Sequence, residues 1–404
     1  MTTLHSCSRH FEESVDLNDV ARGDGLLFVR DGVGIAARGI AVEVPSTRVT
    51  EALSAIDTAP GSFAPRAIGA LPFAPGSAGS FVVPAISVVK TASGEQHLVA
   101  VANDAAAAEA LLIGAHREIT GTTPSVPRPH PGRFSVGALT AVDVYLAAVA
   151  AARDAVRKGD ITKAVIARDI QVASNEPIDV HAVLLRLKAS FGSSYRYSYR
   201  GLVGASPELL VEVDDHTIRS NPLAGTTART GDPATDRALA EALLASEKNQ
   251  IEHRVVVDMV HDTLLPYCSY LDWEPEASVV AVANVQHLGT RVEGRLNRPA
   301  HVVDLARLLC PTPALGGHPR DAAVELISRV EGMDRGLYGG AIGWCDATGN
   351  GTFAVTIRCA EFTDDRTRAR LFAGGGIVAE SDPESELAET QAKFQAMLSA
   401  LVRP

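Results

Sequence analysis

The sequence predicts an α/β protein of the α+β kind, in which largely antiparallel β-sheets are covered by helices. One pattern in the sequence leads to this prediction. Short apolar and β-branched runs, which predict strands, are separated by Gly- and Pro-containing turns as well as by helices. A strict βαβ succession would instead place a helix after every strand. The 404 residues are 46% hydrophobic and can bury a large core. Length alone favours two or three domains, although single α/β domains of this size exist.

The N-terminal part, residues 1–123, predicts short strands and one helix. Residues 81–89 form a β-branched run that predicts strand, and the Ala-rich stretch near 104–115 predicts a helix. Residues 124–133 contain four prolines and a glycine, which predicts a loop and marks the best boundary candidate in the chain.

Residues 134–404 mix helices and strands. The pattern predicts helices over 141–158 and 246–265, and strands over 164–167, 202–213, 281–293 and 351–362. We find no internal repeat and no low-complexity tract in the sequence.

The composition argues against several classes of function. A net charge of −11, without any block of Lys or Arg, argues against a nucleic-acid partner. No apolar run reaches the roughly 18 residues that a membrane span needs. The first residues lack a basic segment followed by an apolar one, so no signal peptide is expected. The five cysteines are scattered, without a Cys-x-x-Cys pair, which favours reduced thiols and a cytoplasmic location.

The C-terminal segment predicts an amphipathic helix with an unusual polar flank. Its apolar stripe contains Leu387, Phe394, Leu398 and Leu401. Beside this stripe, positions three and four apart bring two carboxylates and an ammonium group onto one arc, namely those of Glu386, Glu389 and Lys393. This arc is either a solvated flank or a site that holds a divalent cation and an anion side by side.

A glycine-rich approach precedes this helix. The strand before it is expected to end in Gly374, Gly375 and Gly376, whose backbone N–H groups could approach an anion without obstruction by side chains. The G-x-G-x-x-G spacing of dinucleotide-binding proteins is absent, so a tight turn is the alternative. Ser381, Asp382 and Pro383 are residues that typically begin a helix.

Two further positions carry candidate acid–base groups. Lys163 starts an apolar strand, where desolvation would lower its pKa and make it a base; a lysine at a strand edge that reaches solvent is the alternative. Glu208 lies among apolar residues, where burial would raise its pKa and suit it to donate a proton; an exposed strand-edge glutamate is the alternative.

Two more positions are candidate ligands. Glu252 lies one helical turn before Val255 and Val256 and should face the same interior, where a carboxylate needs a partner such as a metal ion. Arg358 is expected on a strand face with small and polar residues, either as a clamp for a substrate carboxylate or as half of a structural ion pair.

With these residues described, the chain resembles the chorismate-utilising enzymes, and within them the isochorismate synthases of the siderophore-pathway type. The resemblance extends from about Lys163 to Lys393, and residues 1–123 carry little of it. The ordered motifs are KAVIAR (163–168), GASPE (204–208), NPLAGT (221–226), SEKNQIEH (246–253), VQHLG (285–289), PTPALGG (311–317) and GGAIGWCD (339–346), followed by the Gly374 segment and the acidic helix.

The resemblance implies a single large domain over residues 1–404, with two facing, mostly antiparallel sheets, helices outside and the site between the sheets. It thus replaces the estimate of several domains, with residues 134–404 as the catalytic core region. It also implies that Mg²⁺ anchors the ring carboxylate of chorismate. By position, Glu252 and Glu389 would be metal ligands, and Glu386 would act through water.

The other roles follow the same correspondence. Lys163 would activate water for attack on ring carbon 2, and Glu208 would protonate the hydroxyl that leaves carbon 4. Arg358 and Tyr338 would hold the enolpyruvyl carboxylate. The remaining substrate-binding positions would be Gly225, Thr226, His287, Ala314, Leu315, Gly374, Gly376 and Lys393.

Three positions distinguish members of the family. Lys163 together with Ala224 favours water as the nucleophile, because the anthranilate and aminodeoxychorismate synthases carry Gln at the first position. Ala314 favours release of isochorismate, because salicylate synthases, which also eliminate pyruvate, tend to carry Thr there. A salicylate synthase, a non-catalytic chorismate-binding paralogue and an amidotransferase subunit are the alternatives. Such an isomerase serves siderophore, salicylate or menaquinone synthesis, and we expect a monomer without an obligate protein partner.

Overall fold

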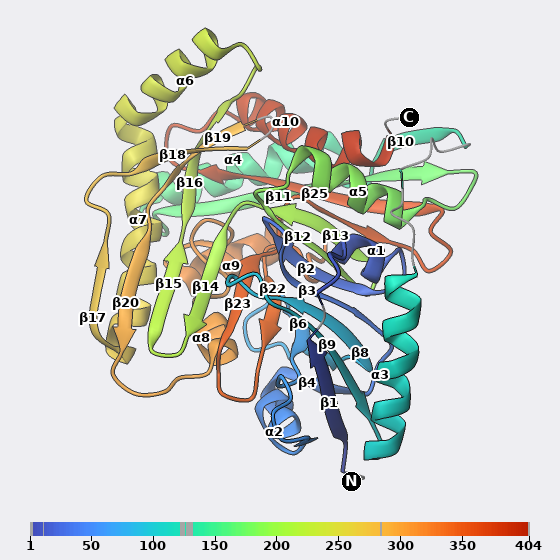
Figure 1. Cartoon of the computed structure of the whole chain (residues 1–404). Coiled ribbons are helices and arrows are strands. Elements are labelled where there is room, and N and C mark those ends of the chain that lie inside the picture. Colours follow the sequence, from blue (N-terminus) through green and yellow to red (C-terminus); the bar gives the residue numbers. More distant parts are fainter. Residues whose placement is uncertain (1–2, 11, 122–125, 127–131, 283–284, 403–404) are drawn as a thin grey trace.

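The computed structural model describes residues 3–10, 12–121, 126, 132–282 and 285–402 (Figure 1). Most of the loop predicted at 124–133 therefore lies outside the described residues. Among the described strands, every pair is antiparallel except β1 (His5–His10) with β5 (Asp57–Thr58). The largely antiparallel sheets expected from the sequence are thus present.

The larger sheet contains thirteen strands within the described residues. In spatial order they are β10 (Phe134–Ala138), β11 (Lys163–Ser174), β25 (Arg368–Ile377), β24 (Cys359–Phe362), β13 (Leu202–Ser206), β12 (Tyr195–Tyr199), β2 (Leu26–Arg30), β3 (Val33–Arg38), β8 (Ile86–Lys90), β9 (Gln96–Ala102), β1 and β5, with β21 (Gly317–His318) paired to β11.

A nine-stranded sheet and a three-stranded sheet complete the strands of the described part. The nine are β17 (Cys268–Trp273), β20 (Val292–Leu296), β15 (Thr217–Asn221), β14 (Leu209–Asp214), β23 (Gly351–Val355), β22 (Ala341–Cys345), β6 (Ala67–Leu71), β7 (Ser80–Val83) and β4 (Val42–Pro45). The three are β16 (Leu223–Ala228), β19 (Val285–Gly289) and β18 (Ser278–Ala281).

Helices cover the outer faces of the two large sheets (Figure 1). A core cluster with Phe28 and Tyr197 from one sheet and Ile68 and Ile342 from the other fills the space between them. The helices are α1 (Leu17–Ala21), α2 (Val49–Ser54), α3 (Ala105–Thr120), α4 (Val142–Lys158), α5 (Val180–Ser190), α6 (Pro233–Ala245), α7 (Glu247–Leu264), α8 (Val302–Leu309), α9 (Arg320–Val330) and α10 (Pro383–Val402), with short 3₁₀ turns at Ser46–Arg48 and Leu265–Tyr267.

Local sequence signals explain where the main helices begin. The side chains of Asp104 and Ser246 accept hydrogen bonds from backbone N–H groups in the first turns of α3 and α7. Asp382 does the same for Ser385 N at 2.9 Å, and Pro383 occupies the first position of α10. The helices predicted at 104–115, 141–158, 246–265 and the C-terminal segment are therefore confirmed, and α3 continues to Thr120.

Four predicted strands are wrong in extent. Residues 81–89 form parts of β7 and β8, which belong to different sheets. Residues 202–213 and 351–362 each form two strands, one in each large sheet, and residues 281–293 contain parts of β18, β19 and β20. Pro207 lacks the N–H that a continuing strand needs, so the chain leaves the larger sheet there. Arg358 adopts a left-handed φ of +53°, which ends the alternation of faces that we expected around it.

These two crossings from sheet to sheet lie side by side. Ala205 N donates to Arg358 O at 3.1 Å, and Val355 N donates to Glu208 O at 3.1 Å. Tyr197, which is fully buried, donates its hydroxyl to Ile357 O at 2.8 Å. Glu208 and Arg358 therefore stand together where the chain passes between the sheets.

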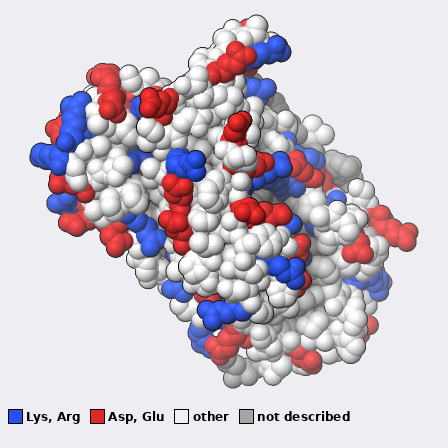
Figure 2. Space-filling view, turned by 90° about the vertical axis from the view of Figure 1, so that its left-hand side faces the viewer, with Lys and Arg blue, Asp and Glu red and all other residues white. Residues whose placement is uncertain are grey.

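The surface and the thiols add little specific information. The face in Figure 2 carries acidic and basic side chains intermingled, and α6 projects from the body of the molecule in Figure 1. Within the described part of the chain, no helix combines the length and the apolar character that crossing a bilayer requires. All five cysteines are free.

Candidate active site

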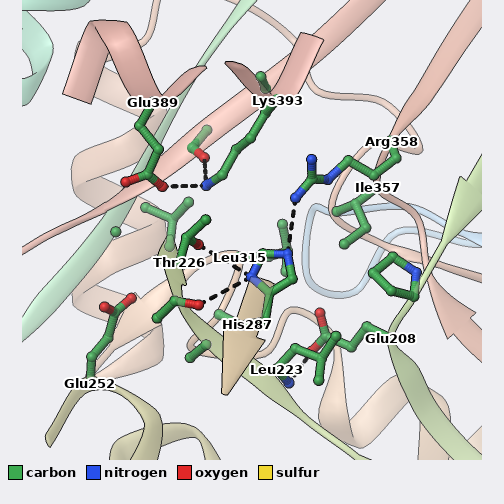
Figure 3. Close-up of a pocket in the computed structure, with 18 of the residues that line it drawn as sticks. Glu208, Leu223, Thr226, Glu252, His287, Leu315, Ile357, Arg358, Glu389 and Lys393 are labelled. Carbon is green, nitrogen blue, oxygen red and sulfur yellow. Dashed lines mark hydrogen bonds and ion pairs between the residues drawn. The ribbon is translucent and has the colours of Figure 1, made fainter. Parts of the chain in front are cut away.

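A pocket of about 230 Å³ lies where β11, β25, α7 and α10 meet (Figure 3). All fifteen site residues predicted from the sequence line it: Lys163, Glu208, Gly225, Thr226, Glu252, His287, Ala314, Leu315, Tyr338, Arg358, Gly374, Gly376, Glu386, Glu389 and Lys393. They come from segments up to 230 positions apart, from Lys163 to Lys393. The volume suits a ligand smaller than a typical drug-sized molecule.

The first pair of charged groups is Lys163 with Glu252. Lys163, at the start of β11, is only 2% exposed, and its Nζ donates to Glu252 Oε1 on α7 at 2.7 Å. The side chain is therefore buried and does not reach solvent at the strand edge, and Glu252 faces inward as predicted.

Glu208 is a buried carboxyl group that also lines the pocket. It is 2% exposed and accepts a 3.4 Å hydrogen bond from Leu223 N. Burial raises its pKa to about 8, against the opposing effects of that hydrogen bond and of the positive charges of Lys163 and Arg358. At neutral pH the group therefore carries a proton that it can donate.

A chain of hydrogen bonds holds His287 and Arg358 together (Figure 3). Arg358 Nη2 lies 3.1 Å from His287 Nε2, and His287 Nδ1 lies 3.1 Å from Gly225 O and 3.3 Å from Thr226 Oγ1. A guanidinium can only donate, so Nε2 is the acceptor and Nδ1 carries the proton. Burial and the charge of Arg358 lower the pKa of His287 to about 3, which agrees with a neutral ring.

The guanidinium of Arg358 has capacity for an anion. It is buried, and burial lowers its pKa against the attraction of nearby acidic groups. Among the described residues, no carboxylate lies within 4.0 Å of it. A buried cation without a carboxylate partner is the arrangement that a clamp for a substrate anion requires.

The arc of α10 predicted from the sequence faces the pocket, so it is no solvated flank. Lys393 Nζ lies 2.6 Å from Glu389 Oε1 and donates to Gly374 O at 2.7 Å. Burial disfavours ionisation of Glu389, but Lys393 outweighs this effect and lowers the pKa of the carboxyl. Burial, followed by the charge of Glu389, raises the pKa of Glu386 to about 7.

The three glycines lie at the end of a strand, as predicted, and do not form a tight turn. Gly374, Gly375 and Gly376 lie within β25 and pair with Ala167, Ile166 and Val165 of β11. What the glycines provide is space. A Cβ on Gly375 would come within 2.5 Å of Glu386 Oε2, and one on Gly376 would come within 2.6 Å of Glu252 Oε1.

These carboxylates fit a divalent cation that the substrate helps to bind. Glu386 Oε2 is buried without a hydrogen-bond partner. Within the described part of the chain, no three His, Cys, Asp or Glu side chains form a ready-made cation cage. Mg²⁺ typically takes only one or two protein carboxylates and completes its shell with water and substrate oxygens. The donor set and the glycine-lined space beside it therefore suit this ion.

One wall of the pocket is apolar and flat. Tyr338 stacks on Phe372 with ring centroids 5.0 Å apart and an interplanar angle of 9°. Leu315, Ile357 and Val165 are further apolar residues that line the pocket. A planar or cyclic substrate can lie against this wall while its anionic groups reach Arg358 and the α10 side.

Some lining residues were not predicted, among them Lys248, Asn249, Ile357 and Phe372. Lys248 and Asn249 belong to the motif at residues 246–253, so their place in the first turn of α7, before Glu252, was a usable signal. Ile357 lies between β23 and β24 and Phe372 in the middle of β25; both are apolar, and no sequence pattern distinguishes them from core residues.

The fold and the pocket define an enzyme-like site for a small cyclic anion, with a protonated acid, a buried lysine and carboxylates suited to a cation. The chain belongs to the chorismate binding enzyme family, whose profile matches residues 54–402. This match begins further towards the N terminus than the motifs from Lys163 onward.

Individual relatives agree with the family. The chain is 44% identical over 271 residues to the putative isochorismate synthase MenF of Mycobacterium tuberculosis, covering 64% of this chain and 73% of the relative. It is 40% identical over 244 residues to the isochorismate synthase EntC of Escherichia coli, covering 59% and 62%.

Solved structures show the same fold. A putative 2,3-dihydroxybenzoate-specific isochorismate synthase, DhbC from Bacillus anthracis, superposes with a TM-score of 0.79 at 32% identity, over 95% of this chain and 98% of that chain. The menaquinone-specific isochorismate synthase MenF from Escherichia coli superposes with a TM-score of 0.85 at 24% identity, over 98% and 94%. The predicted fold class is therefore confirmed.

Proposed function

We propose that this protein is an isochorismate synthase, an isomerase that converts chorismate to isochorismate reversibly. The observation that carries the proposal is the pair of buried groups that line one pocket, Lys163 and the protonated Glu208. The names of the relatives at 39–44% identity support it.

The chemistry of these two groups balances as an isomerisation. In the reacting form of the enzyme Lys163 is the neutral amine: it takes a proton from the water that forms a bond to ring carbon 2, and the Glu252 carboxylate, 2.7 Å away in the structure, stabilises the ammonium that results. Glu208 gives its proton to the hydroxyl on carbon 4, which departs as water. One water is added and one is lost, so substrate and product are isomers and the reaction runs in both directions. Exchange of protons with solvent, from Lys163 and to Glu208, restores the starting state of the enzyme.

Mg²⁺ is the cofactor in this proposal. Glu252 and Glu389 would hold it directly and Glu386 through water, and the bound ion would neutralise the ring carboxylate of chorismate. The buried, unpartnered Oε2 of Glu386 supports this assignment.

The remaining groups hold and orient the substrate. Arg358 and Tyr338 bind the enolpyruvyl carboxylate, since this guanidinium is buried and free of carboxylate partners in the described part of the protein. Lys393 holds the other anionic end beside Gly374, and the neutral His287 fixes the direction of Arg358. Gly376 leaves room for Glu252 and Lys163.

We propose further that the reaction stops at isochorismate. Ala314 presents a methyl group to the pocket where salicylate synthases tend to carry a threonine hydroxyl. In the same proposal, residues 1–404 form one domain and the protein acts as a monomer in the cytoplasm. The five free thiols support a reducing compartment such as the cytoplasm.

Product analysis with a base variant tests the function. Incubation of the protein with chorismate and Mg²⁺ at neutral pH, followed by chromatography, should give isochorismate in equilibrium with chorismate. Lys163→Ala should lose about 10²–10⁴-fold in turnover while still binding chorismate. Stoichiometric salicylate and pyruvate would instead identify a salicylate synthase, and near-normal turnover by Lys163→Ala would show that another residue is the base.

A further inference from the structure

The outer edge of β11 has a gap in its strand pairing close to the pocket. On that edge, β21 pairs with Lys163 and Ala164, and β10 pairs only from Ile170 onward. Among the described residues no strand covers the interval between them. Two side chains fill it: Glu331 Oε1 accepts from Ala167 N at 2.7 Å, and Arg335 Nη2 donates to Val165 O at 2.7 Å.

Arg335 and Glu331 form a buried ion pair with further contacts. They are 3% and 2% exposed. Arg335 Nε donates to Glu331 Oε2 at 2.8 Å, Nη2 also contacts Glu331 Oε1, and Nη1 donates to Leu315 O at 2.8 Å. The guanidinium carbon lies 4.2 Å from the centre of the Phe73 ring and 5.8 Å from that of Tyr338.

These contacts reach the pocket wall from behind. Val165, Leu315 and Tyr338 all line the pocket, whereas Arg335 and Glu331 do not. Val165 lies two residues after the proposed base, Leu315 follows Ala314, and the backbone N–H of Tyr338 donates to Arg335 O at 2.9 Å. The guanidinium thus joins two separate segments of the pocket, at Val165 and Leu315, and the backbone of Arg335 holds Tyr338 beside them.

We propose that the Arg335–Glu331 pair fixes the positions of the turn at Ala314–Leu315 and of the Tyr338 ring relative to the start of β11. Through these positions the pair sets the affinity for chorismate. The inference rests on the proposed substrate of the site. A guanidinium carries its N–H donors on three nitrogens in one plane, so it can donate to Glu331 and to two backbone carbonyls at once. A lysine carries its three donors on a single nitrogen, which cannot lie close to all of these acceptors.

A purely structural pair would behave differently. Loss of a buried pair that only stabilises the fold lowers the folded fraction and leaves the KM of the folded molecules unchanged. Loss of a positioning pair displaces Leu315 and Tyr338, so the KM rises while the acid–base groups, and hence the pH dependence of kcat, are retained.

The test compares Arg335→Lys with Arg38→Lys in the full chain. Arg38 on β3 is a matched control, because it also donates to two backbone carbonyls, those of Val20 and Asp19, and to one glutamate, Glu118, and it does not line the pocket. Thermal unfolding, KM, kcat over pH 6–9 and calorimetric affinity for chorismate are measured for each folded protein.

We expect Arg335→Lys to weaken chorismate binding and raise the KM about tenfold or more, with kcat and its pH profile nearly unchanged and Arg38→Lys at the wild-type KM. If Arg335→Lys does not fold, Glu331→Gln, which retains an acceptor for Ala167 N, takes its place. An unchanged KM and affinity, or an equal rise in Arg38→Lys, would overturn the proposal. Wild-type protein that binds chorismate without forming isochorismate would refute the proposed function and leave the affinity comparison valid.

Discussion

Because Glu208 is protonated in the folded protein, the free energy of unfolding should fall as the pH rises, and the variant Glu208→Gln should lack this contribution to the pH dependence. The side chain is buried, and its pKa is raised from 4.5 to about 8. The charged and titratable groups that face it are Lys163, Arg358 and the thiol of Cys310. Glutamine keeps the shape and the acceptor for Leu223 N, but it cannot ionise.

The magnitude follows from the two pKa values. Above pH 4.5 the carboxyl of the unfolded chain releases its proton, while the folded one retains it up to about pH 8. Rising pH therefore favours the unfolded state, so this contribution to stability is complete below pH 4.5, falls between pH 4.5 and 8, and is constant above. With about 1.4 kcal/mol for each pH unit, the loss between pH 5 and pH 7.5 is about 3 kcal/mol.

Urea unfolding of wild-type protein and Glu208→Gln at pH 5.0, 6.0 and 7.5 measures this loss. The stability of the variant relative to wild type should increase by about 3 kcal/mol over this range, and Glu12→Gln, at an exposed glutamate, should show no such trend. The kcat of the wild type should fall as pH rises through about 8, because the proton donor is lost. A stability difference that does not change with pH would mean that Glu208 is ionised at neutral pH and is not the acid.

Two further predictions concern the metal and the glycines. Removal of metal with EDTA should abolish turnover, and addition of Mg²⁺ should restore it. Glu252→Gln should raise the Mg²⁺ concentration needed for half-maximal activity without unfolding the protein. Full activity in the absence of metal would refute the metal assignment. Gly376→Ala should lose most activity, because its Cβ would come within 2.6 Å of Glu252 Oε1 and 2.8 Å of Lys163 Cε, whereas Gly137→Ala in β10, with no atom within 4 Å, should retain it; equal activities would contradict this account.

The helices of this fold are predictable because their signals are local. The prediction for 246–265 differs by one residue at each end from Glu247–Leu264, since Ser246 caps the helix. The strands were predicted too long where the chain passes from one sheet to the other. Apolar alternation continues through both crossings, and only Pro207 interrupts it, so the pattern does not reveal which sheet a residue joins.

The site shows a similar limit. The arc of Glu386, Glu389 and Lys393 was visible because helical spacing alone places these residues together. The role of Gly375 and Gly376 was missed, since their absent side chains matter only through Glu386 and Glu252, which come from α10 and α7. Arg335 has one local partner, Glu331, four positions before it, but its contact with Val165 O lies 170 positions away in β11 and gives no local signal.

The two crossings also explain why Glu208 and Arg358, the proposed acid and the proposed carboxylate clamp, occur together. Side chains within a strand point to alternate faces, whereas a residue at a crossing can point into the space between the sheets. Glu208 and Arg358 occupy such positions, and the hydrogen bonds Ala205 N to Arg358 O and Val355 N to Glu208 O tie one crossing to the other. The backbone that places the carboxyl group of Glu208 therefore also places the guanidinium of Arg358, so the distance between these two side chains is set by the meeting of the two sheets. Loops on the surface could be exchanged without changing this distance, but neither crossing could be altered alone.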